Sequence, residues 1–280
     1  MAKRKTTRRR VRTKIVWTLA AVGVPAAVGF LLMYIVPVII TGVYSLLDNS
    51  FSRSFVGLEN YAAIWRNSYF LLALKNTAVI TLLLVLSASL LSLLTGYLLY
   101  KHPSMTGWGI SLLLLPLLMP SASMTTLWQA LFQTSSFSSA WVSYTALTTL
   151  FVWKYAGTGA MLVYIGLKEI EPDILHAAAL DGATPLCIYT RISLPMIVNH
   201  IALMLLFFLM FAFRIYKECY LLFGLYPPES IYLIAHYMNN HFQKMNFQNV
   251  GASAISLSGL SILLYGLAAL LLQKRRQTVR

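Results

Sequence analysis

Residues 176–195 read HAAALDGATPLCIYTRISLP, a stretch rich in small residues between two long apolar runs. Just before it, Pro172 suits the first turn of a helix, because proline lacks only an N–H that would be unpaired there. Asp173 complements the positive end of such a helix. Asp181 and Gly182 should end it, since glycine readily adopts the left-handed conformation that closes helices. We therefore predict a short helix from Pro172 to about Gly182.

A second short helix should follow, because Thr184 and Pro185 form an N-cap and a first helical position. It should end before Leu194, since the residue that precedes Pro195 is disfavoured in the α region. Two interpretations remain open for this pair of helices. Its alanines leave a smooth surface that another protein could approach, or the segment is a linker that lies under a helix bundle.

The rest of the chain is strongly apolar. Of its 280 residues 58% are hydrophobic and 11% are charged, against about a quarter charged in soluble domains. Several apolar runs exceed the roughly 20 residues that a membrane-spanning helix needs. We predict an all-α polytopic membrane protein with six spans near 16–46, 70–100, 107–131, 142–167, 197–221 and 250–273. Basic cytoplasmic tails would occupy residues 1–14 and 274–280. The first span and its outer loop would occupy 15–69, and a core of five spans would occupy 70–273.

The charge distribution predicts the orientation. The formal net charge is +14, and eight of the 22 Lys and Arg residues lie in the first 14 positions. Basic flanks are typical of cytoplasmic ends, so both termini and residues 168–196 should be cytoplasmic. Because the basic residues cluster at the ends of apolar segments, they favour contact with membrane lipid and argue against nucleic acid.

Besides Lys75 near the outer end of the second span, four charged residues fall inside predicted spans. Lys154 lies near the middle of the fourth span, where a charge costs about 2.5–3.5 kcal/mol on insertion scales. It is a pathway residue or a structural donor to backbone carbonyls at a broken helix. Arg214, Lys217 and Glu218 share one face of the fifth span. They could hold a sugar in the translocation path, form an internal Arg214–Glu218 pair, or reach toward lipid head groups.

The sequence offers no catalytic pattern. Its five histidines lack metal-ligand spacing, and it has neither a Walker A motif nor a nucleophile elbow. We expect no cofactor, no metal site and no ATP hydrolysis by this chain itself.

Residues 176–195 resemble the cytoplasmic EAA signature of bacterial ATP-binding-cassette (ABC) importer permeases, which is E-A-A, three residues, G, nine residues, I-x-L-P. His176 stands in place of the glutamate, and the matching or typical residues are Ala177, Ala178, Asp181, Gly182, Ala183, Ile192, Leu194 and Pro195. The segments FVGLENY at 55–61 and FRIYKECYLLFGLYPPES at 213–230 are similar to the carbohydrate branch of this family, which includes the maltose and glycerol-phosphate permeases.

The resemblance implies an importer subunit in the bacterial cell membrane. Its partners would be a second homologous permease, an ATPase dimer that binds ATP and Mg²⁺ at the cytoplasmic face, and an extracytoplasmic solute-binding protein. Residues 176–195 would dock into the ATPase, and loops 48–69 and 222–249 would face the binding protein. Because a histidine cannot replace the charge-assisted bonds of a carboxylate, the docking groove should not depend on a cation at His176.

By this resemblance the substrate is a sugar, an oligosaccharide or a sugar derivative. Three alternatives stay open. One is an importer of the same superfamily for amino acids, peptides or phosphate. Another is a proton- or sodium-coupled carrier, for which only Glu218 is available as an intramembrane acid. The third is a membrane scaffold, which would leave the docking pattern unexplained.

Overall fold

A computed structural model describes residues 21, 23–49, 52–132 and 139–278, with side chains to residue 266. This part of the chain is helical and contains no strand, only an isolated bridge between Leu47 and Phe55. The elements are η1 (Leu31–Ile35), α2 (Val36–Tyr44), α3 (Glu59–Arg66), α4 (Ser68–Lys101), α5 (Pro103–Leu118), α6 (Ser121–Phe132), α7 (Ala140–Lys168), α8 (Pro172–Leu180), α9 (Pro185–Cys187), η3 (Ile188–Ser193), α10 (Leu194–Met196), α11 (Val198–Phe213), α12 (Tyr216–Phe223), η4 (Glu229–Ile231), α13 (Ile234–Gln243) and α14 (Phe247–Thr278).

The helices form two compact units. The first consists of Met1–Trp65 with His241–Gly266, and the second of Arg66–Asn240 with Leu267–Arg280. Five described helices are long and apolar enough to cross a membrane: Gly23–Tyr44, Ser68–Lys101, Ala140–Lys168, Val198–Phe223 and Phe247–Gly266. A sixth span results if α5 and α6 count as one broken span. The described part of the chain thus has the helices of a multi-pass membrane protein.

In the first unit, α14 crosses α2 at very short range. A Cβ atom on Gly251 would lie 2.6 Å from the carbonyl oxygen of Thr41, so only glycine fits this crossing. The turn after α2 is held by the FVGLENY segment, whose Asn60 amide donates to the carbonyls of Ser45 (2.9 Å) and Leu47 (2.7 Å). Part of this motif therefore has a structural role, since it caps the end of a span.

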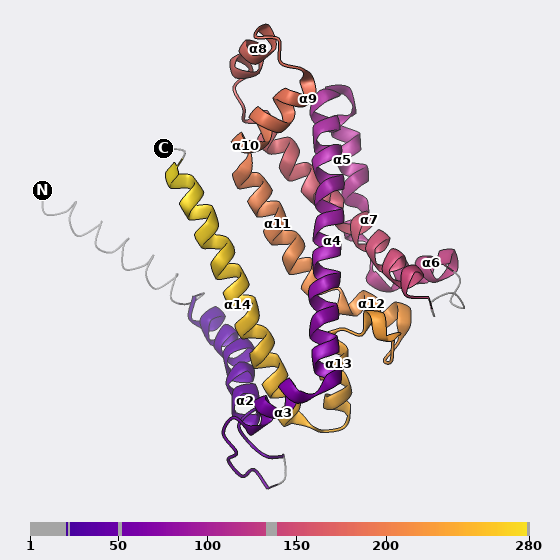
Figure 1. Cartoon of the computed structure of the whole chain (residues 1–280), viewed down its shortest axis with the longest axis vertical. Coiled ribbons are helices and arrows are strands. Elements are labelled where there is room, and N and C mark those ends of the chain that lie inside the picture. Colours follow the sequence, from indigo (N-terminus) through magenta and orange to yellow (C-terminus); the bar gives the residue numbers. More distant parts are fainter. Residues whose placement is uncertain (1–20, 22, 50–51, 133–138, 279–280) are drawn as a thin grey trace, which may run out of the picture. The chain divides into compact units, whose positions relative to one another are not determined.

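In the second unit, α4 and α7 pack along each other over much of their length. Gly96 admits the carbonyl of Ala160, because a Cβ atom there would lie 2.8 Å from that oxygen. The Ser92 hydroxyl donates to the carbonyl of Ala156 at 2.9 Å. Figure 1 shows α8 near one end of α4 and α13 near the other. The α4–α7 pair is the rigid frame to which the functional segments are attached.

The predicted span 107–131 corresponds to two helices with a sharp bend between them. Helices α5 and α6 meet at 94°. Met119, between them, is extended (φ −75°, ψ 137°) because the ring of Pro120 disfavours the α conformation in the preceding residue. Pro116, by contrast, lies inside α5 without ending the helix.

Candidate functional site

The first helix of the segment at 172–196 has the predicted ends. Helix α8 begins with Pro172 at its first position and ends at Leu180. Gly182 has a φ of +83°, and its N–H donates to the carbonyl of Ala179. The next N–H, of Ala183, donates to the carbonyl of Ala178, which completes a Schellman motif. The bend between the two short helices is therefore fixed by backbone hydrogen bonds.

The second helix continues further than predicted. It begins as expected, with the Thr184 hydroxyl accepting from the N–H of Cys187 at 3.3 Å. It was expected to end before Leu194, but α9, η3 and α10 continue to Met196, and the chain leaves the helix at Ile197 (φ −91°, ψ 19°). The reason is the π-helical turn η3, in which the N–H of Leu194 donates to the carbonyl of Tyr189, five residues earlier. This wider turn relieves the clash that a proline ring otherwise makes with a carbonyl four residues before it.

The segment presents an uncovered apolar surface in this structure. No residue of α8 is buried, and Leu180, at its end, is 89% exposed. Among the predicted docking residues, His176, Ala177, Asp181, Gly182 and Pro195 are exposed, whereas Ala178, Ala183, Ile192 and Leu194 are half-buried. Helix α8 packs against η3, so η3 fixes the position of its exposed face.

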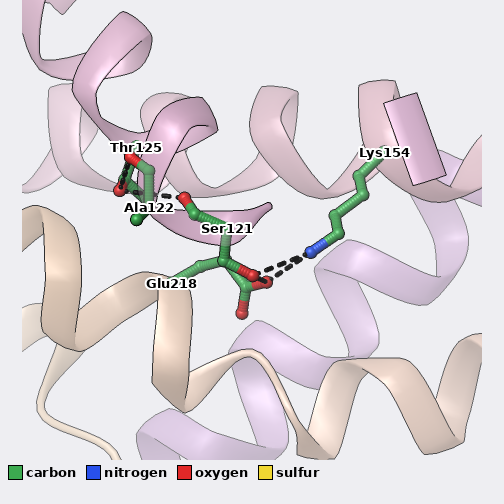
Figure 2. A network of polar contacts seen from close by, with 5 residues as sticks. All are labelled: Ser121, Ala122, Thr125, Lys154 and Glu218. Atoms are coloured by element: carbon green, nitrogen blue, oxygen red, sulfur yellow. Dashed lines mark hydrogen bonds and ion pairs between the residues drawn. The ribbon is translucent and has the colours of Figure 1, made fainter. Parts of the chain in front are cut away.

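Two of the four predicted pathway residues meet in a buried ion pair. The Lys154 Nζ atom of α7 lies 2.6 Å from Oε1 of Glu218 in α12, with side chains 8% and 4% exposed. Lys154 also donates to the Ser121 hydroxyl at 3.1 Å, and Ser121 donates to the same Glu218 oxygen at 2.9 Å. Figure 2 shows this closed triangle, with Thr125 bonded behind it to the carbonyl groups of Ser121 and Ala122.

The triangle connects three helices. Ser121 is the first residue of α6, directly after the bend at Pro120, so the pair joins the bent segment to α7 and α12. A buried ammonium group needs a compensating charge or several acceptors, and Glu218 with Ser121 supplies them. Lys154 is thus a donor to side chains, not to backbone carbonyls, and the pair fills its site without any ligand.

Arg214 and Lys217 are placed differently. Both are exposed. The Arg214–Glu218 pair, one of the three alternatives, is not formed, because Glu218 bonds to Lys154 and Ser121 instead. Arg214 ends α11 (φ −91°, ψ 0°), and α12 begins at Tyr216. This break shifts the helical spacing on which the expectation of one shared face depended.

Sequence reasoning missed the residues that fasten the segment after α12. The Asn76 amide of α4 donates to the carbonyls of Glu229 (2.6 Å) and Tyr232 (3.1 Å). The Thr77 hydroxyl accepts from the N–H of Ile234 at 2.9 Å. Asn76 and Thr77 are adjacent polar residues in the mostly apolar run FLLALKNTAVITLLL. This local polarity was the signal that could have identified them.

No family model matches the chain, but curated proteins do. A probable ABC transporter permease, y4oQ of Sinorhizobium fredii, is 29% identical over 216 residues, 69% of each chain. The glucose import permease GlcT of Saccharolobus solfataricus is 27% identical over 65% of this chain and 69% of its own. The sulfoquinovosyl glycerol permease SmoG of Agrobacterium fabrum is 26% identical over 87% of this chain and 84% of its own.

A solved structure has the same fold. A bacterial ABC transporter that imports the acidic polysaccharide alginate contains a chain that matches 98% of this one and 100% of its own, with a TM-score of 0.78 and 21% identity. The sequence relatives, the multi-pass helical fold and this structural match agree. The chain is therefore similar to ABC transporter permeases, and its curated relatives include permeases named for glucose, sulfoquinovosyl glycerol and sn-glycerol-3-phosphate.

Proposed function

We propose that this chain is one of two transmembrane permease subunits of a binding-protein-dependent importer for a sugar, an oligosaccharide or a sugar derivative. A partner ATPase dimer would bind ATP with Mg²⁺ and supply the energy. The α5–α6 pair would form one broken span, giving six spans with both termini in the cytoplasm. The single observation that carries the proposal is the exposed helix α8, with a fixed bend after it at Gly182, in the sequence context of the EAA signature.

The structure suggests how such a subunit would work. Helix α8 offers small side chains and the apolar tip of Leu180 to a groove on the ATPase. Because the Schellman motif fixes the bend, α8 and η3 would move as one body when the ATPase dimer closes. That movement would shift the spans and expose a central cavity, shared with the second permease, to a solute-binding protein.

The docking role has a direct test, the variant Leu180→Glu. It places a charge on the most exposed apolar side chain of the segment, and a desolvated unpaired charge opposes association. We expect the ATPase subunit to be lost during copurification and uptake to cease, while the permease still inserts. Phe55→Glu is the control, because Phe55 is 75% exposed and lies on a loop of expected outer location. An ATPase that stays bound to the Leu180→Glu variant would contradict the docking role.

Arg214 and Lys217 suggest that the substrate carries a negative group. They lie in the candidate span Val198–Phe223, whose acidic residue Glu218 is already paired with Lys154. Exposed charges in such a segment should face a watery cavity or a partner, and Lys154 and Glu218 would form the wall behind them. Among the relatives, SmoG is named for a sulfonated sugar derivative, whereas GlcT is named for glucose.

Uptake competition tests this assignment. With Arg214→Gln, we expect the half-saturation concentration for an acidic sugar to rise about tenfold, the effect of losing one hydrogen bond to a charged group. The value for a neutral sugar should change little. Lys244→Gln, a change of the same charge on a segment outside the spans, is the control. Unchanged kinetics for both sugars would instead place Arg214 at lipid head groups.

A further inference from the structure

Tyr189 connects the docking segment (residues 172–196) to the long helix α4. Its hydroxyl donates to the backbone carbonyl of Leu93 at 2.7 Å, and its ring packs on Tyr97, with centroids 4.3 Å apart. Lys101 lies over the same Tyr97 ring, with its Nζ atom 5.8 Å from the ring centroid. Positions 93, 97 and 101 are four residues apart, so they follow one face of α4 over successive turns.

The hydrogen bond is well defined chemically. In a helix the carbonyl of residue 93 accepts from the N–H of residue 97, and its second lone pair is free for Tyr189. Burial raises the pKa of Tyr189 to about 12, so its hydroxyl keeps its proton at neutral pH and remains a donor. One phenol group thus contributes both a directional bond and an aromatic contact to α4.

Tyr189 also has a special position in its own helix. It belongs to the π-helical turn η3, and its carbonyl accepts the N–H of Leu194 across that turn. Single π turns are rare and are frequently found at functional sites. Helix α8 packs on η3, so a displacement of α8 reaches Tyr189 through one short element.

We propose that Tyr189 is the positioning residue through which the docking segment moves α4, and with it the α4–α7 pair. Leu175 and Leu194 of the segment also pack against the buried core, but Tyr189 makes a directional hydrogen bond to the backbone of α4. This inference rests on the proposed function, because it takes α8 as the site where the ATPase docks. It adds a lateral connection in the middle of the segment.

The test is Tyr189→Phe in the complete transporter, reconstituted in proteoliposomes with its ATPase, second permease and binding protein. The ring and its contact with Tyr97 remain, and only the bond to Leu93 is lost. We expect ATPase copurification and ATP hydrolysis to persist while solute uptake per ATP hydrolysed falls about fivefold, the factor that one net hydrogen bond implies.

Two further variants make the result specific. Thr190→Val, in the next position, removes a hydroxyl that bonds only within its own helix, to Leu186, and should leave uptake per ATP unchanged. Tyr97→Ala removes the stacking partner from α4 without altering the docking segment, and should lower uptake per ATP as Tyr189→Phe does.

The outcomes separate the two proposals. Unchanged uptake per ATP in both Tyr189→Phe and Tyr97→Ala would overturn the inference on Tyr189. So would loss of the ATPase from Tyr189→Phe, since the residue would then support docking and not transmission. A wild-type complex that never retains an ATPase would overturn the proposed function itself, and the inference with it.

Discussion

At the scale of single residues, the Lys154–Glu218 pair gives a quantitative prediction. Glu218→Gln leaves a buried ammonium group without its counter-charge, so it should destabilise the protein by about 3–5 kcal/mol, the usual effect of breaking a buried pair. Lys154→Met combined with Glu218→Leu removes both charges and should cost much less. Thermal unfolding in detergent, followed by the fluorescence of a thiol-reactive or aggregation-sensitive dye, measures both variants. A single variant as stable as the double variant would show that the pair contributes little.

The sequence identified these residues but not their relationship. A lysine in an apolar run is conspicuous because of its cost, and so is the cluster at 214–218. However, Lys154 and Glu218 are 64 positions apart, and no spacing rule connects residues on different helices. Ser121 carried no signal, because a serine after a proline is common in any turn. Pairing across helices depends on the tertiary arrangement, including the break at Arg214.

At the scale of helices, local rules succeeded where backbone chemistry decides the outcome. The start of α8 at Pro172 and its end before Gly182 follow from the missing N–H of proline and the permitted positive φ of glycine. Proline in the interior was harder to predict. The rule for the residue before proline holds at Met119 and fails at Leu194, where the π turn provides room for the ring of Pro195. Whether a helix bends or widens depends on neighbouring helices, which a local pattern does not contain.

At the scale of the whole molecule, hydropathy was the most informative property of the sequence. A chain with so few charges cannot cover its apolar surface in water, and the long apolar runs predicted the positions of the five spanning helices within a few residues at most described ends. Hydropathy could not predict the sharp α5–α6 bend, because the two helices together are apolar enough to be one span. It also could not predict the close α4–α7 packing, which depends on individual glycines.

The orientation of the whole chain remains a prediction from its basic residues, and its native cysteines can test it. Cys187 lies in the docking segment and is partly exposed, whereas Cys219 is buried. Because the basic flanks should keep the docking segment in the cytoplasm, a membrane-impermeant maleimide should label Cys187 only after cells are permeabilised. In a chain that lacks both cysteines, a single Trp141→Cys should be labelled in intact cells, since Trp141 is 82% exposed at the end of α7 that is remote from the docking segment. Labelling of Cys187 in intact cells would show that the docking segment faces the outside, where the ATPase could not reach α8.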